Sequence, residues 1–155
     1  NVLPSLAAIQ AGLGFDAAEL KKVVLRSPSV LSCSMDGNAL PSLAVLQERL
    51  GLSETELKRV VLGMPAVLSY SIEANVHPKL DWLQNKMGLN VESLRQRIIQ
   101  HPAFLGYSLS ERYCPRLEAC CMACVPVITV LNSITMPDSR FYRSIGAHIN
   151  VHDRN

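Results

Sequence analysis

Residues 40–76 read LPSLAVLQERLGLSETELKRVVLGMPAVLSYSIEANV, and this pattern returns every 37 residues. Without a gap, residues 3–39 are identical to it at 20 of 37 positions, and residues 77–112 match residues 40–75 at 12 of 36. A period between about 20 and 50 residues is typical of stacked repeats. The sequence therefore predicts a solenoid rather than a globule with one closed core.

The first half of this copy predicts one helix, called helix A. Leucines recur at steps of three and four residues from Leu40 to Leu50, which gives one apolar face. Pro41 suits the first helical turn, where its missing N–H is not needed. Gly51 suits the left-handed residue that ends many helices. Helix A is therefore expected over residues 40–50.

The second half predicts another helix, called helix B, and a short turn. Ser53 and Glu56 have the spacing of a capping box, so helix B begins there. Pro65 ends it, because the residue before a proline is pushed out of the α region. The segment 65–71 is too short for a further full helix, and we expect a single 3₁₀ turn.

The repeat predicts an all-α fold, a curved helical-repeat solenoid in which each unit is helix A, helix B and a 3₁₀ turn. We expect the array to occupy residues 1–124. Its copies are expected at about 3–39, 40–76 and 77–113, with a partial copy at 114–124.

The pattern fails after Cys124, where Val125-Pro126-Val127 replaces the glycine and the capping text. Turn-forming residues are frequent in the rest of the chain. We therefore expect residues 125–155 to form an irregular or disordered tail, with a short strand-like stretch from Val127 to Leu131.

Composition bounds the class of protein. The chain has 155 residues, 48% of them apolar, and a net charge of +2, which is too small to indicate a polyanionic partner by itself. No apolar run is long enough for a membrane span. Five cysteines without framework spacing favour a reducing compartment. Because the chain begins at Asn1 with repeat text, we expect any targeting peptide to lie upstream.

Four phrases resemble the repeat of the mitochondrial transcription termination factor (mTERF) family, and the resemblance covers roughly residues 3–118. The phrases are GLS at 51–53, PAVLSYS at 65–71, NVHPKLDWL at 75–83 and YSLSERYCPR at 107–116. The last of these resembles the basic Arg–Pro–Arg phrase of the family's later repeats.

The resemblance implies a solenoid that holds double-stranded DNA or RNA in a basic groove. It implies a role in organellar gene expression, such as transcription termination or RNA processing, in a mitochondrion or a chloroplast. We expect a monomer with no cofactor, no membrane segment and no small-molecule substrate. An enzyme is not expected either, since no nucleophile elbow, phosphate loop or carboxylate pair is present.

Two neighbouring positions of helix B, each compared across the successive copies as a column, carry basic residues. Stacking of the copies could align these side chains into a ladder that contacts phosphates. A solvated face is the competing interpretation. Net charge is 0 over residues 4–40, −1 over 41–77, +2 over 78–114 and +1 over 115–155, which favours the C-terminal half as the binding region. The family phrase adds two arginines. The candidate contact residues are Lys21, Lys22, Lys58, Arg59, Arg95, Arg112 and Arg116.

Other patterns compete with this interpretation. Tyr70 and Tyr107 share a column and could stack on bases, or pack against the core. Cys121 and Cys124 have a metal-like spacing, but a structural zinc site commonly needs two such pairs. The repeat aligns Cys120 and Cys124 with buried leucines, so both are expected in the core.

An alternative function keeps the same fold. A tetratricopeptide-like scaffold would use the concave face to bind proteins, although that repeat has a period of 34 residues and lacks the two proline positions seen here. A continuous basic groove would favour nucleic acid, and a neutral apolar groove would favour a protein partner.

Overall fold

The computed structural model describes residues 2–32 and 39–152, with side chains described over 4–32 and 39–146. These residues are helical or in turns, and no strand occurs among them. The chain divides into two compact units, Asn1–Gly106 and Tyr107–Asn155. Within the described residues, no helix has both the length and the apolar character that a membrane crossing requires.

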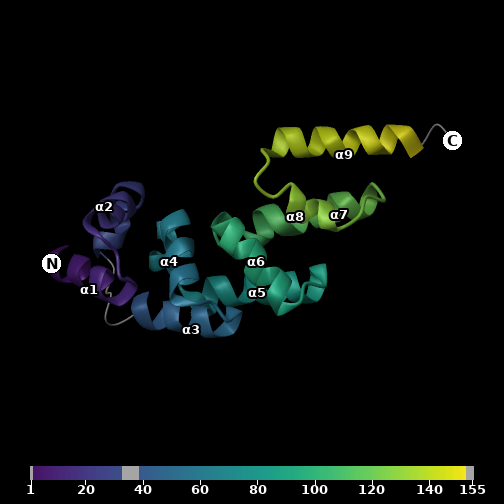
Figure 1. The fold of residues 1–155 in the computed structure, drawn as a ribbon. Helices are drawn as coiled ribbons and strands as arrows, with labels where there is room; N and C mark the ends of the chain where they lie inside the picture. The colour runs from purple at the N-terminus through teal and green to yellow at the C-terminus, as the bar shows by residue number, and fades with distance from the viewer. Residues whose placement is uncertain (1, 33–38, 153–155) are drawn as a thin grey trace. The chain divides into compact units, whose positions relative to one another are not determined.

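The first unit contains three helix pairs, each followed by a short tight turn (Figure 1). The expected helix A, helix B and 3₁₀ order is therefore confirmed. The elements are α1 (Val2–Leu13), α2 (Ala17–Arg26), η1 (Pro28–Ser32), α3 (Leu40–Leu50), α4 (Glu54–Gly63), η3 (Pro65–Ser69), η4 (Ile72–Val76), α5 (His77–Met87), α6 (Val91–Gln100) and η5 (Pro102–Leu105).

The local signals act as the sequence predicts. Ser53 and Glu56 form a capping box at the start of α4, with each side chain bonded to the other's backbone N–H. Gly51 follows α3 with φ 63°, a left-handed conformation in which a side chain would be strained. Helix α4 ends at Gly63, with Met64 as its cap directly before Pro65.

The helix B elements pack in succession, α2 against α4 and α4 against α6. Apolar side chains from this row, such as Val23, Val60 and Ile98, are fully buried. The residues of η3 that point inward, Val67 and Leu68, are buried as well. One helix pair cannot cover both of its faces, so neighbouring repeats share one continuous core.

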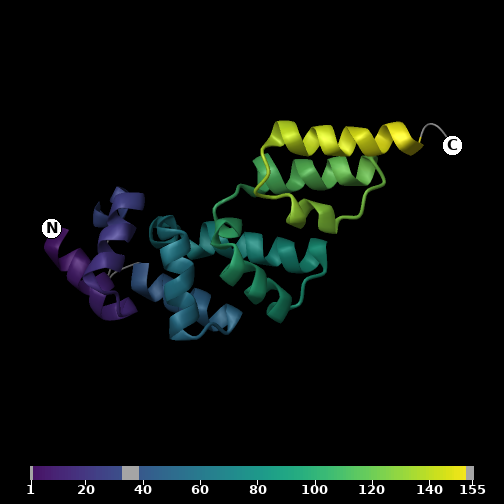
Figure 2. The same cartoon turned by 45° about the horizontal axis from the view of Figure 1, so that its top comes forward.

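The second unit contains η6 (Leu109–Tyr113), α7 (Cys114–Met122), α8 (Ile128–Asn132) and α9 (Asp138–His152). In this unit α7 packs against both α8 and α9, and Figure 2 shows α9 running beside α7. The buried apolar residues come from η6, the three helices and the turns between them: Tyr113, Cys120, Ala123, Val130, Leu131, Ile134, Phe141 and Ile145.

The expected irregular tail over 125–155 is wrong for the described residues, because α8 and α9 are helices (residues 153–155 lie outside the described range). The strand-like stretch at 127–131 is also wrong. A helical turn bonds its own backbone, as in the 3.0 Å bond from the Ser133 N–H to the Thr129 carbonyl, whereas a lone strand needs a neighbour. Phe141 and Ile145, four residues apart, are both buried and carried the missed helical signal.

Candidate nucleic-acid interface

The first basic column, Lys21, Lys58 and Arg95, does not form a free ladder. Lys58 on α4 places its Nζ 2.8 Å from the Glu19 carboxylate and donates to the Gly14 carbonyl, also at 2.8 Å. Glu19 belongs to the capping box of α2, so this lysine ties one helix B to the start of the previous one. Its side chain is only 27% exposed, which fits neither a ladder open to phosphates nor a fully solvated face.

Arg95 repeats the arrangement one copy later. Its Nη2 lies 2.7 Å from Glu56 on α4, and its Nη1 lies 3.0 Å from Glu92 on its own helix. The bond from Arg95, together with the Ser53 N–H, lowers the pKa of Glu56 to about 2. The same cause, a bond from Lys58, lowers the pKa of Glu19. Lys58 and Arg95 are therefore inter-repeat ties.

Three other candidates remain open to solvent. Lys21 and Lys22 on α2 and Arg59 on α4 are exposed, and none of the three makes an ion pair within the described residues. Lys22 and Arg59 occupy equivalent positions on helices that pack together. The third copy has Gln96 there, and its amide donates to Glu92 at 2.9 Å. We call Lys21, Lys22 and Arg59 the exposed helix B cations.

Arg116 is buried in the second unit, with 1% of its side chain exposed. Its guanidinium donates to the Ser133 carbonyl, to the Met136 carbonyl at 2.6 Å and to Asp138 at 2.6 Å. It also lies 4.5 Å from the centre of the Phe141 ring. A guanidinium enclosed in this way cannot reach a phosphate, so Arg116 leaves the candidate set.

Arg112 is half-buried and joins the same cluster. It donates to the Met136 carbonyl at 3.0 Å, lies 3.6 Å from the Asp138 carboxylate and stacks over the Tyr107 ring at 4.5 Å. A bond from Arg116 is the main cause that lowers the pKa of Asp138. These contacts hold α9 to the start of α7.

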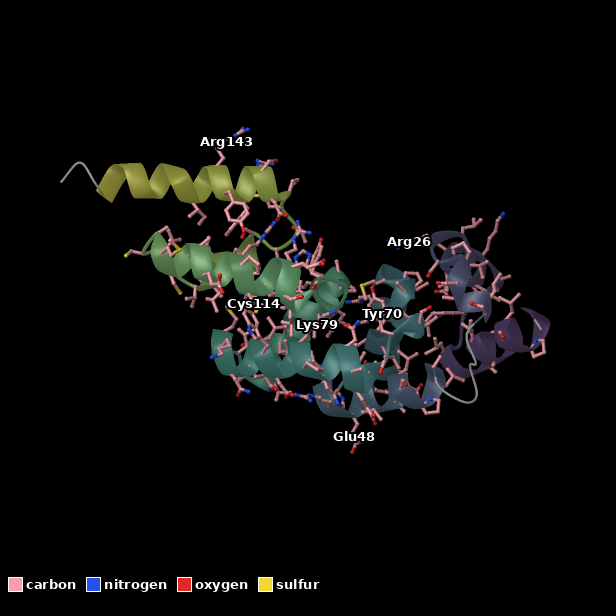
Figure 3. All side chains as sticks on the ribbon, turned by 180° about the vertical axis from the view of Figure 1, so that it is seen from behind. Arg26, Glu48, Tyr70, Lys79, Cys114 and Arg143 are labelled. Carbon is pink, nitrogen blue, oxygen red and sulfur yellow. The ribbon has the colours of Figure 1, made fainter. Side chains whose placement is uncertain are left out.

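A buried lysine in the first unit was missed by the sequence argument. Lys79, at the start of α5, is 5% exposed and donates to the Leu105 carbonyl at 2.6 Å. Its Nζ lies 5.6 Å from the centre of the Tyr70 ring, and Figure 3 shows the two side chains close together. Burial lowers the pKa of Lys79. One feature of the sequence could have identified it. Lys79 and Arg116 occupy the same position of the repeat, directly after the proline in the first turn of helix A.

The two tyrosines of the shared column each lie under a cation, Tyr70 under Lys79 and Tyr107 under Arg112. Both are half-buried. One face of each ring is therefore occupied inside the protein, which leaves less of it for a base to stack on.

A hollow of about 840 Å³ lies in the first unit, between residues of the first and second copies. Its lining is rich in hydroxyl groups, carries the carboxylate of Glu73 and includes no lysine or arginine among the described residues. Phosphate oxygens would gain no ionic contact there. The hydroxyl-bearing residues are Ser32, Ser42, Ser69, Tyr70 and Ser71.

The cysteines divide by burial. Cys120 is fully buried, as its alignment with Leu46 predicts. The expectation that Cys124 is buried is wrong, because α7 ends at Met122 and Cys124 is exposed in the turn after it. Cys124 has a left-handed backbone with φ 53°, which does not continue an α-helix, and Pro126 also disfavours the α region for Val125. In the described part of the chain, no group of three or more His, Cys, Asp or Glu side chains could hold a metal.

The sequence matches the family model described as mTERF over residues 4–141. The chain belongs to the mTERF family. The match includes residues of both units, and the helical-repeat fold of the family agrees with the helices seen here. A comparison with curated proteins finds no match. Membership in the mTERF family suggests nucleic-acid-associated regulation in organelles.

Proposed function

We propose that this mTERF-family chain is a nucleic-acid-binding regulator of organellar gene expression, acting in transcription termination or regulation, or in RNA processing. The observation that carries the proposal is the family match over residues 4–141, on a chain whose successive repeats present cations at equivalent positions of helix B. The partner is double-stranded DNA or RNA, bound by a monomer in a mitochondrion or a chloroplast.

The exposed helix B cations are the contacts we assign to phosphates. Within the described residues they make no ion pair, whereas Lys58 and Arg95 are engaged with carboxylates. Packed helices lie about 8–10 Å apart. Cations at equivalent positions on α2 and α4 therefore recur at a spacing that can follow a nucleic-acid backbone. Such contacts fix the register of the protein and carry no base specificity.

We infer that the ion pairs of Lys58 and Arg95 position the helices that carry the exposed helix B cations. The Lys58–Glu19 and Arg95–Glu56 pairs each join one helix B to the next. Each acid is also a capping residue or a partner of one, so the pair links the start of a helix to its neighbour. Lys58 and Arg95, two members of the first basic column, thus support the contact surface rather than forming it.

The test is a titration of labelled DNA and RNA duplexes with the wild-type chain and with a variant carrying Lys21→Glu, Lys22→Glu and Arg59→Glu. We expect the wild-type chain to bind at low salt and the variant to lose affinity, with the slope of log K against log[salt] shallower by about 2–3. Lys22→Glu alone is compared with Lys86→Glu, a matched change at an exposed lysine of helix A.

Two outcomes would count against the proposal. If the wild-type chain binds neither duplex, a protein-binding scaffold becomes the better account. If Lys86→Glu weakens binding as much as Lys22→Glu, the contact surface is not on helix B. Circular dichroism of each variant shows whether its helices are intact.

A further inference from the structure

The turn after α7 brings two exposed cysteines together. Cys121 lies in the last turn of the helix, and the N–H of Cys124 donates to its carbonyl at 3.2 Å. Between them, Ala123 has φ −84° and ψ 2°, which are the angles of the third residue of a type I turn. The first and fourth Cα atoms of such a turn lie within about 7 Å, and a disulfide spans Cα atoms about 4.4–6.8 Å apart.

Cys124 has an unusual backbone conformation. Its φ of 53° is the one positive value at a non-glycine residue in the described chain. The helix A of each earlier copy (α1, α3 and α5) is followed by a glycine in this conformation. These glycines are Gly14, Gly51 and Gly88. A side chain in the left-handed region is strained, because Cβ comes too close to the following carbonyl oxygen. The thiol of Cys124, which the repeat aligns with Leu50, thus stands in a conformation that the other copies give to the glycine one position later.

The other cysteines do not compete for this pair. Cys120 is fully buried, and burial raises the pKa of its thiol, which disfavours the reactive thiolate. Cys114 begins α7, and seven residues of helix separate it from Cys121 by about 10 Å. Cys33 lies outside the described residues.

We propose that Cys121 and Cys124 form a dithiol redox site that reacts with disulfides of the glutathione class or with a protein disulfide. The thiolate of one cysteine attacks a sulfur of the incoming disulfide and forms a mixed disulfide, releasing one thiolate. The second cysteine then attacks the mixed disulfide, closes the Cys121–Cys124 bond and releases the other thiolate. The pair loses two electrons and two protons, and one external disulfide is reduced to two thiols.

A Cys121–Cys124 disulfide would restrict the motion of the segment that connects α7 to α8. It would hold Cys124 at the end of α7 and limit the opening of that turn. The backbone bond from Cys124 to Cys121 already holds the two residues in the turn that the disulfide would close. The inference does not depend on the proposed binding of nucleic acid.

The experiment equilibrates the full chain in buffers with different ratios of reduced to oxidised glutathione, alkylates the remaining thiols and digests with trypsin. Cleavage after Arg116 and Arg140 leaves Cys120, Cys121 and Cys124 on one peptide, while Cys114 and Cys33 lie on others. In oxidising buffer we expect this peptide to be lighter by two hydrogen atoms and to carry one alkyl group, where the reduced peptide carries three.

Single variants assign the bond. Cys121→Ser and Cys124→Ser should each abolish the bridged peptide, whereas Cys120→Ser should keep it. The proposal is overturned if the peptide carries three alkyl groups in the most oxidising buffer, if it carries glutathione adducts without a bridge, or if the bridge persists in Cys121→Ser.

Discussion

The two units of this protein use basic side chains at different depths. In the first unit, Lys58 and Arg95 are half-buried and join neighbouring helices through carboxylates. In the second, Arg116 is enclosed and gathers two carbonyl groups and Asp138 around its guanidinium. A basic column in a repeat therefore does not by itself mark a ligand surface. A basic side chain is available to a ligand only where no neighbouring carboxylate or carbonyl group already binds it.

The two units are also stabilised by different arrangements of polar contacts. The first unit repeats one pairing at each step, so each ion pair supports one junction between repeats. In the second unit, Arg112 on η6 and Arg116 on α7 both donate to the Met136 carbonyl and pair with Asp138 at the start of α9. In Figure 3 the labelled Arg143 points away from α9 and marks a surface cation of the same unit.

The largest effect is expected from Arg116→Met. The variant removes the charged donor from the Ser133 and Met136 carbonyls, which keep the Met136 N–H and Arg112 as donors. A hydrogen bond to a charged group contributes about 1.5–3 kcal/mol. We expect the second unit to lose about 3 kcal/mol of stability, because several charged hydrogen bonds are lost and the remaining donors offset part of their contribution. Hydrogen exchange should show faster exchange of the α8 and α9 amides, with little change in α4 and α6.

Arg140→Met is the matched control, because Arg140 is an exposed arginine of α9. It should leave exchange in α8 and α9 unchanged. Equal exchange rates in wild type and Arg116→Met would show that the buried arginine does not hold this unit together.

A smaller pair of effects is expected at the ends of helix A. Gly51→Ala forces a side chain into a left-handed conformation and should destabilise the first unit by about 1 kcal/mol. Cys124→Gly removes such a side chain and should stabilise the second unit by a similar amount, about 1 kcal/mol. Urea denaturation measures both, and the comparison fails if the two changes have the same sign.

The sequence predicted the first unit well because its signals are local. Ser53 with Glu56, Gly51 and Pro65 each act within one turn of the chain, so their spacing is sufficient. The second unit was mispredicted because α8 has only five residues and α9 comes after a segment without repeat text. Its helices are stabilised by tertiary contacts such as that of Arg116 with Phe141, which no period reveals.

The candidate site was predicted only in part, for a related reason. The columns located the cations on helix B, but they did not show that Glu19 and Glu56 lie across the helix junction from Lys58 and Arg95. The acids share a column of their own, two positions before the bases. That pairing is visible in the sequence only once the packing of helix B against helix B is known.

A modest pH effect is expected from Glu56. Its pKa is lowered from 4.5 to about 2 in the folded chain, so the folded state prefers the ionised carboxylate. This contribution to stability is complete above the ordinary pKa and is lost as pH falls from about 4.5 towards 2. The stability difference between wild type and Glu56→Gln should therefore shrink over that range.

Glu54→Gln serves as the control for this measurement, since Glu54 is exposed and makes no ion pair within the described residues. Urea midpoints are compared at several pH values between 6 and about 3. A difference between wild type and Glu56→Gln that stays constant across the range would contradict the role given to the Arg95–Glu56 pair.

The most direct test of the account compares the salt dependence of duplex binding for four single variants: Lys22→Gln, Arg59→Gln, Lys58→Gln and Arg95→Gln. Each exposed cation that meets a phosphate contributes about 0.9 to the slope of log K against log[salt]. We predict that Lys22→Gln and Arg59→Gln each reduce the slope by about that amount, while Lys58→Gln and Arg95→Gln leave it unchanged and lower the urea midpoint instead. The reverse pattern, with the slope reduced only by Lys58→Gln and Arg95→Gln, would contradict the account.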